Sequence, residues 1–364
     1  MLIKDVMNVI EDLAPLSLQE PYDNAGLITG DKNSEVKKIL VCVDTTEAIV
    51  DEAIFKDCNL IIAHHPIVFS GLKKFTGADY VQRTIIKAIK NDIAIYAAHT
   101  NLDNIQDGVN LKICQKLNLK NGKILSGKKQ LLKKLITFCP VDYADKVKGA
   151  MFEAGAGKIG NYDECSSNTK GMGTFRPSAN AHPFSGNVGE RNEEQEIKIE
   201  TVFPFYQEEK ILKALMQSHP YEEVAFDIVQ LDNKHPLIGA GMIAETEAPV
   251  TETAFLNFLK NQMKAGCLRY TPLLNKSIQK VAVCGGSGSF LLKDAIAAEA
   301  DIFITADFKY HQFFDAEGKI LIADIGHYEL EQFTMDIFYD LLLKNFPTFA
   351  VYLPETNTNP VKYL

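Results

Sequence analysis

The chain has 364 residues, which is long enough for two domains and a large core. Its hydrophobic content of 46% and charged content of 23% are ordinary for a globular protein. The net charge of −9 argues against a general nucleic-acid or anionic-membrane binder, because both functions need a basic surface.

The N-terminal residues and the cysteines both indicate a cytoplasmic protein. The first fifteen residues carry apolar side chains at helical spacing, interrupted by acidic residues. We expect a helix there, and neither a signal peptide nor a membrane span. The seven cysteines are scattered and include no Cys-x-x-Cys pair, which is typical of reduced thiols.

Residues 38–120 alternate between strand and helix patterns. Apolar, β-branched runs predict strands, and amphipathic runs between them predict helices. The expected strands are 39–44, 60–63 and 93–98, and the expected helices are 46–56, capped by Thr45 or Thr46, and 79–90. This βαβαβ order predicts a parallel sheet with helices on both faces.

The middle of the chain has a different pattern and carries a weak internal repeat. Residues 136–155 and 200–220 each indicate a strand, a proline and then a Lys- and Ala-containing helix. Residues 222–231 supply a further strand, and two βαβ halves make a ferredoxin-like unit. We therefore expect two domains: an α/β domain of residues 1–127 plus 234–364, and a small α+β domain inserted into it at 128–233.

The last part of the chain returns to alternating strands and helices. Strands are expected at 280–284, 302–305, 320–323 and 349–353, with a long helix at 328–343. The segment Gly285-Gly-Ser-Gly-Ser289 follows the first of these strands and opens a helix. Glycine-rich amides in that position can cradle a phosphate, but the Gly-Lys-Ser/Thr of a Walker loop is missing. We expect a tight structural turn.

Histidines and a carboxylate follow two strands of the expected parallel sheet. His64 and His65 end one strand, and His99 and Asp103 follow the next. Ligands of open α/β sheets gather at the carboxyl ends of strands. Adjacent residues of an extended chain point to opposite sides, so His64 and His65 are placed for two neighbouring ions rather than for one. Taken alone, the pair fits a capped strand end equally well.

A third group follows the strand expected at 320–323. His327 and Glu331 are four residues apart at a helix start, which puts them on one face, one turn apart. An imidazole and a carboxylate so placed form a natural chelating pair. Alone, this spacing is typical of a solvated helix face. Three such groups at neighbouring strand ends predict a metal centre.

Three motifs resemble the signatures of the NGG-interacting-factor-three-like family, and the resemblance covers nearly the whole chain. The motifs are AHHPIVF at 63–69, HTNLD at 99–103 and GHYELE at 326–331. Bacterial members are labelled dinuclear-metal hexameric proteins or GTP cyclohydrolase 1 type 2 homologues. The insert resembles that of the long bacterial form at 154–165, 173–177 and 219–228, and it is similar to trimeric PII-like and CutA-like modules. One departure is Tyr22-Asp-Asn, where the family often has Trp-Asp-Asn.

The resemblance implies a dinuclear metal centre with five ligands. They are His64, His65, Asp103, His327 and Glu331, and Glu331 occupies the position of the carboxylate that bridges both ions. Five ligands are too many for one tetrahedral ion and too few to saturate two, which leaves the open positions of a catalytic site. Three imidazoles and two carboxylates suit Zn, Fe, Mn, Co or Ni better than Mg or Ca.

Three further residues are candidates for proton transfer or substrate binding. His99 is expected to orient Asp103 or substrate, or else to be a satisfied strand-end histidine. Asp307 and His311 lie four residues apart in an Asp-x-Lys-Tyr-His stretch, and a similar stretch lines the pocket in the family.

Two functions from different classes fit these features. The first is a metal-dependent hydrolase of the GTP cyclohydrolase or phosphoesterase type, acting on a small nucleotide-like substrate. The alternative is a non-catalytic metal-binding or regulatory oligomer whose PII-like insert senses a ligand. The resemblance implies a homohexamer with two divalent transition-metal ions per chain. We expect a small-molecule substrate and no membrane or nucleic-acid partner.

Overall fold

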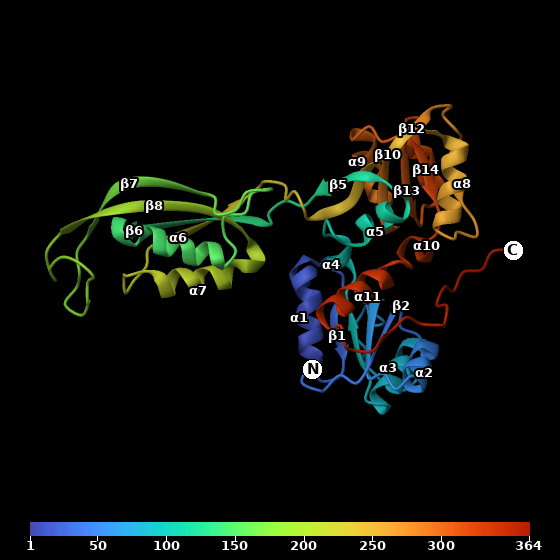
Figure 1. Cartoon of the computed structure of the whole chain (residues 1–364), viewed down its shortest axis with the longest axis horizontal. Coiled ribbons are helices and arrows are strands. Elements are labelled where there is room, and N and C mark those ends of the chain that lie inside the picture. Colours follow the sequence, from blue (N-terminus) through green and yellow to red (C-terminus); the bar gives the residue numbers. More distant parts are fainter. The chain divides into compact units, whose positions relative to one another are not determined.

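The computed structural model describes residues 1–364, which divide into two compact units. Met1–Gly127 and Leu237–Leu364 form one, called here the core unit, and Lys128–Pro236 form the other, the inserted unit (Figure 1). The architecture is mixed α/β with three separate sheets. None of the helices combines the length and the apolar character that crossing a bilayer requires.

The first sheet of the core unit has five strands in the order β1-β4-β3-β2-β15. In that order they are Gly26–Thr29, Ala94–Ala97, Leu60–His65, Ile39–Asp44 and Val351–Tyr352. All run parallel except β1, which is antiparallel to β4. Nearly every residue of β2, β3 and β4 is buried, which explains their continuous apolar runs. The parallel sheet predicted over 38–120 is confirmed.

Helices cover both faces of this sheet. Figure 1 shows α1 (Ile3–Leu13) and α11 (Thr334–Asn345) on one side, and α2 (Glu47–Phe55) and α3 (Tyr80–Lys90) on the other. The side chains of Thr46 and Asp79 cap α2 and α3 by accepting from the amides of Ile49 and Gln82. Helix α2 therefore starts directly after β2, whereas a loop separates α3 from His65 at the carboxyl end of β3.

The second sheet of the core unit has six strands in the order β11-β14-β13-β12-β10-β5. They are Arg269–Tyr270, Leu321–Asp324, Ile302–Ala306, Ser277–Ser287, Gly239–Thr251 and Lys120–Gly127. Only β12, β13 and β14 run parallel to one another, because β10, β5 and β11 are antiparallel to their neighbours. Three strands predicted in this half of the chain, β12, β13 and β14, are thus parallel to one another. The sequence analysis missed the antiparallel strands beside them, among them β10, which pairs with both β12 and β5. Helices α5 (Val109–Lys116), α8 (Glu252–Gln262) and α9 (Leu292–Ala297) pack against this sheet.

Short elements complete the core unit. They are the helices α4 (Thr100–Asp103) and α10 (His327–Glu331), and the 3₁₀ turns at Leu16–Leu18, Ser289–Leu291 and Tyr310–Ala316. The single helix predicted at 328–343 is thus split into α10 and α11. The Thr334 hydroxyl donates to the carbonyl of Glu331 at 2.8 Å, in place of the backbone donor of a continuous helix. The break lets α10 run in its own direction, and α10 carries His327 and Glu331.

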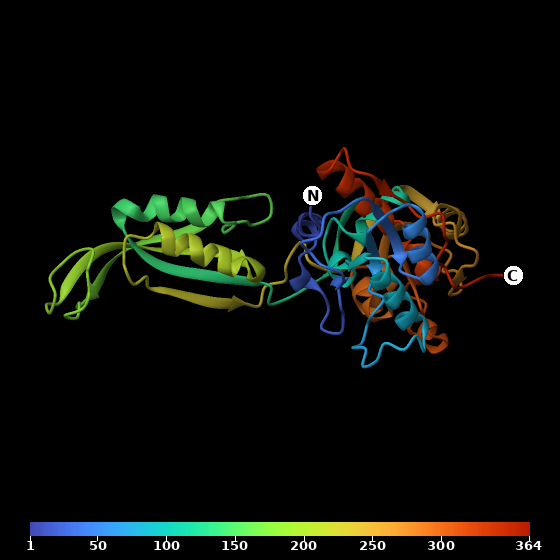
Figure 2. The ribbon, with the colours of Figure 1, turned by 90° about the horizontal axis from the view of Figure 1, so that it is seen from below.

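The inserted unit has a four-stranded antiparallel sheet in the order β7-β8-β6-β9. Its elements in chain order are β6 (Leu132–Pro140), α6 (Ala144–Glu153), β7 (Ser166–Phe175), β8 (Asn192–Pro204), α7 (Glu208–Ser218) and β9 (Phe226–Leu231), with 3₁₀ turns at Val141–Tyr143 and Phe205–Gln207. Figure 2 shows both helices on the same face of the sheet, and the apolar core of this unit lies between them and the strands. The sequence did not reveal β7, whose residues are mostly polar, glycine or exposed.

We predict that replacing residues 128–236 by Asn-Gly leaves the core unit folded. Gly127 of β5 and Gly239 of β10 are paired neighbours on adjacent antiparallel strands, so a short hairpin loop spans the gap. Circular dichroism should show retained secondary structure and one cooperative thermal transition. Insoluble or non-cooperative products from several different loop sequences would contradict this prediction.

Candidate metal centre

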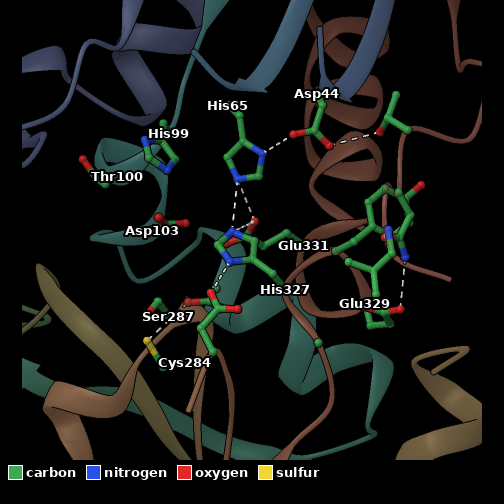
Figure 3. A pocket seen from close by; sticks show the side chains of 18 of the residues that line it. Asp44, His65, His99, Thr100, Asp103, Cys284, Ser287, His327, Glu329 and Glu331 are labelled. Atoms are coloured by element: carbon green, nitrogen blue, oxygen red, sulfur yellow. Dashed lines mark hydrogen bonds and ion pairs between the residues drawn. The ribbon is translucent and has the colours of Figure 1, made fainter. Parts of the chain in front are cut away.

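His64 and His65 stand at the carboxyl end of β3, and each ring is held by a partner at Nδ1. His64 is fully buried and donates from Nδ1 to the carbonyl of Ala98 at 2.9 Å. The Nδ1 of His65 lies 2.7 Å from Oδ1 of Asp44, the last residue of β2 (Figure 3). Fixing Nδ1 in this way sets the orientation of a ring and leaves Nε2 to bind a metal.

His327 of α10 uses the same arrangement from the second sheet. Its Nδ1 lies 2.7 Å from Oδ2 of Asp307, which follows β13. Its Nε2 lies 3.4 Å from Nε2 of His65. Asp307 has a φ of 59°, in the left-handed region that non-glycine residues rarely adopt, and such strain gathers at functional sites.

The three imidazoles converge on one buried carboxylate oxygen. Oε2 of Glu331 lies 2.8 Å from Nε2 of His65, 3.0 Å from Nε2 of His327 and 3.8 Å from Nε2 of His64. Oδ1 of Asp103, at the end of α4, lies 3.7 Å from Nε2 of His64. The structure therefore brings together all five residues that the sequence proposed as metal ligands.

Two buried polar atoms in this cluster have no hydrogen-bond partner. They are Nε2 of His64 and Oδ1 of Asp103. A buried polar group without a partner costs about 1–3 kcal/mol, so such atoms need an explanation. Nitrogen and oxygen donors pointed at one another in this way fit divalent transition-metal ions.

Burial and close contacts shift the pKa values of the carboxylates and imidazoles in the cluster. Burial raises the pKa of Asp103 well above its usual range, and nearby Glu331 adds to that rise. Burial would also raise the pKa of Glu331, but hydrogen bonds from imidazoles hold it well below its usual range. Burial lowers the pKa of His64 to about 4. At His65 and His327 the carboxylate contacts outweigh burial and raise the pKa values to about 10 and about 11. Protons there balance buried Glu331, and a cation bound at the same atoms would displace them.

His99 lies at the edge of the cluster and is held by Asp23. Its Nδ1 lies 2.8 Å from Oδ1 of Asp23, and its ring centroid lies 5.4 Å from that of His64 and 5.3 Å from that of His65. Asp23 also accepts from the amide and hydroxyl of Thr100. Burial would raise the pKa of Asp23, but these hydrogen bonds lower it to about 2. His99 is thus a fixed imidazole beside the ligands, held by an ionised carboxylate.

The remaining sequence candidates are placed differently. Asp307 lines the cavity and orients His327. The structure does not bring His311 to the cavity: its side chain is exposed, and its ring contacts Tyr310 and Phe314. Four residues after Asp307 the chain is in a 3₁₀ turn and not in an α-helix, so the i,i+4 argument that linked the two does not hold.

The glycine-rich segment after β12 supports Glu331. Gly286 has a φ of +59°, and a Cβ atom built on it would lie 2.4 Å from Oε1 of Glu331 and 3.3 Å from Cε1 of His327. Glycine is required here both by the backbone conformation and by the close approach of the carboxylate. The glycine-rich segment therefore packs directly against Glu331, the proposed bridging ligand.

A cavity of about 1000 Å³ opens onto the cluster, and the C-terminal tail forms part of its wall. The hydroxyl of Thr358 donates to Oδ2 of Asp44 at 3.1 Å, and the side-chain amide of Asn359 donates to Glu329 at 3.1 Å. Asp44 therefore contacts His65 with one oxygen and the tail with the other (Figure 3). Sequence analysis missed Asp44, although its position at the carboxyl end of β2 is the same signal that singled out His64 and His65.

Fold and site together define a mixed α/β protein with a buried His/Glu cluster that could hold a metal ion. The family model of Duf34/NIF3 (NGG1p interacting factor 3) matches residues 1–360. The chain belongs to this family.

Relatives are similar over the full length of the chain. A Bacillus subtilis protein named GTP cyclohydrolase 1 type 2 homolog is 35% identical, covering 99% of this chain and 98% of the relative. A Staphylococcus epidermidis protein of the same name is 33% identical and covers 100% of both. The crystal structure of a Bacillus cereus protein related to NIF3 matches with a TM-score of 0.87 at 34% identity, covering 100% of this chain and 99% of that one. These matches span both units.

We predict that Gly286→Ala weakens metal binding while the protein stays folded. The added methyl group clashes with Glu331 and the residue must keep a positive φ, so the carboxylate moves away from the imidazoles. Elemental analysis after reconstitution should show loss of at least half of the bound metal. Gly71→Ala is the matched control, since a Cβ there meets no atom within 4 Å. Equal metal content in both variants would contradict the proposed role of Gly286.

Proposed function

We propose that the protein is a metal-dependent hydrolase with a dinuclear centre, acting on a small nucleotide-like substrate. The observation that carries this proposal is the convergence of three imidazoles on one buried oxygen of Glu331, at a cavity large enough for a small molecule. The proposed ligands are His64, His65, Asp103, His327 and Glu331, and the proposed ions are two of Zn, Fe, Mn, Co or Ni.

The geometry favours Glu331 as the ligand shared by both ions. Its Oε2 is the atom that all three imidazoles approach, whereas Asp103 approaches only His64. Divalent ions held by these residues would supply two functions: they would polarise the bond to be broken and lower the pKa of bound water to near 7. Asp44 and Asp307 would keep His65 and His327 oriented.

His99 is the strongest candidate for proton transfer. Its Nδ1 is held by Asp23, which leaves Nε2 as the atom able to give or take a proton at the cavity. Asp307 is a second candidate, but its contact with His327 favours a positioning role. The name GTP cyclohydrolase 1 type 2 homolog belongs to the relatives, and a phosphoester is an alternative substrate with the same need for metal.

A regulatory, non-catalytic metal protein is the second proposal, and the inserted unit favours it. The order βαββαβ with sheet order β7-β8-β6-β9 is that of a ferredoxin-like unit, the topology we associate with PII-like and CutA-like modules. On this proposal the core unit is the metal-binding domain and the inserted unit is a PII-like domain that senses a small ligand. We place either function in the cytoplasm, in keeping with seven unpaired cysteines.

We further propose a homohexamer, by resemblance to the dinuclear-metal hexameric proteins. Two trimers related by two-fold axes make a closed assembly. Light scattering coupled to size exclusion should report a mass of six chains. A monomer at micromolar concentration would contradict the assembly while leaving the proposed metal centre intact.

We predict about two metal ions per reconstituted chain, and fewer than one in Glu331→Ala, because this change removes a ligand from both ions. Glu329→Gln is the matched control: it is buried on the same short helix but contacts Asn359 and not the imidazoles. Elemental analysis measures the ions, and a screen of nucleotides and phosphodiesters measures turnover.

Chelation, His65→Ala and Asp103→Ala should each reduce turnover to background. Turnover that survives chelation would contradict the hydrolase, and one ion or none in the unmodified chain would contradict the dinuclear centre.

A further inference from the structure

The wall of the cavity has an unusual balance of charge for a nucleotide site. Seven carboxylates line it: Glu20, Asp44, Asp103, Asp307, Asp324, Glu329 and Glu331. Arg269 is the one guanidinium, and no lysine contributes. In the metal-loaded form, with all of these groups ionised, seven negative charges against one positive leave six, and two divalent cations would offset four of them. The wall away from the ions therefore keeps a net negative charge, which disfavours polyanions.

The single cation is already paired. The guanidinium of Arg269 forms an ion pair with buried Asp324 and donates to the carbonyl of Phe308 at 3.1 Å. Asp324 also accepts from the amide of Phe308 at 2.9 Å, so this contact fixes the loop after β13. The charge of Arg269 is therefore balanced within the protein before any ligand enters.

Three backbone amides at the cavity are already paired within the protein. The amide of Thr100, at the start of α4, donates to Asp23, and that of Gly326, before α10, donates to Asp324. In the glycine-rich segment the amide of Gly285 donates to the side chain of Asn110 at 2.9 Å. Phosphate sites normally leave such amides for the ligand. In this cavity, side-chain oxygen atoms of Asp23, Asp324 and Asn110 accept the hydrogen bonds from these three amides.

Aromatic side chains, by contrast, gather around the cavity and remain exposed. Those that line it with at least 45% of their surface exposed are Tyr22, Phe69, Tyr80, Phe290 and Tyr363. They come from five separate segments of the core unit, and the ring of Phe69 lies 5.7 Å from that of His99, next to the ligand cluster. A group of exposed apolar side chains with a polar surround marks a binding surface, and flat rings are what aromatic faces bind best.

We infer that the substrate of this site is a flat heteroaromatic compound of low negative charge and nucleoside size, and not a nucleoside triphosphate. The inference rests on the proposed function and narrows its substrate class. The ring packs on the aromatic side chains, which places its polar substituents beside His99 and the metal ligands. Each added phosphoryl group brings one to two negative charges into a wall that is already acidic, and three of its backbone amides are already paired.

The test compares binding of guanosine, adenosine and uridine with that of their triphosphates. Equilibrium dialysis is performed at 0.15 M ionic strength on the full chain, metal-free and metal-loaded, with the metal content measured afterwards. Each nucleoside that binds should do so at least tenfold more tightly than its triphosphate in both forms. Triphosphates that bind as tightly as their nucleosides, or no binding by any of the three nucleosides, would overturn the inference.

Three variants test the named features. Phe290→Ala and Tyr80→Ala should each weaken nucleoside binding about tenfold, the size expected for losing one stacking face. Phe55→Ala is the matched control, an exposed phenyl group that does not line the cavity, and it should change nothing. Ser287→Lys adds a cation to the wall at an exposed position, and it should raise the affinity for triphosphates about fivefold relative to the affinity for nucleosides. Equal effects of Phe55→Ala and Phe290→Ala, or no such relative gain of triphosphate affinity in Ser287→Lys, would overturn the assignment.

The outcomes also separate this inference from the hydrolase proposal. Nucleosides that bind in the expected order without any turnover would support the inference and contradict the hydrolase. Triphosphates that bind best and are hydrolysed would support the hydrolase and overturn the inference.

Discussion

The buried carboxylate of Glu331 imposes the constraint on which the rest of the core unit depends. A carboxylate that is 2% exposed needs positive charge close by, and here imidazoles supply it from two directions. His64 and His65 come from the end of β3 in the five-stranded sheet, whereas His327 comes from α10, which follows β14 of the six-stranded sheet. The same oxygen therefore ties the two sheets together, and each must stay in register with the other for the cluster to form.

Each of the three rings that meet Glu331 is oriented by a second partner at its Nδ1. A backbone carbonyl holds His64, and carboxylates at strand ends hold His65 and His327. Partners of this kind set the ring orientation before any ion arrives, which lowers the cost of ordering the ligands. Gly286 acts on the other side, because the absence of a side chain lets the Glu331 carboxylate reach its place.

The sequence predicted the features of the core unit that depend on residues close together in the chain. Continuous apolar runs predicted β2, β3 and β4, and a cap at Thr45 or Thr46 predicted the start of α2, which Thr46 caps in the structure. The three motifs at strand ends pointed to side chains that the structure indeed brings together. Features that depend on distant partners were missed. Strand β10 is defined by its pairing with β12 and with β5, and the whole inserted unit separates it from β5 in the sequence. Asp23 carries no local mark of its contact with His99, 76 residues away.

The C-terminal tail forms one wall of the cavity, and it is held in place by weaker interactions than the other walls. Most of the wall belongs to packed sheets and helices, whose displacement would expose the apolar core. The tail has no regular structure after Tyr352, and it is held chiefly by polar contacts: its amides at Glu355 and Thr356 donate to Glu52, and its side chains at Thr358 and Asn359 donate to carboxylates. Releasing a few hydrogen bonds costs far less than opening a core, so small molecules can exchange with solvent along this side while the ligand cluster stays assembled.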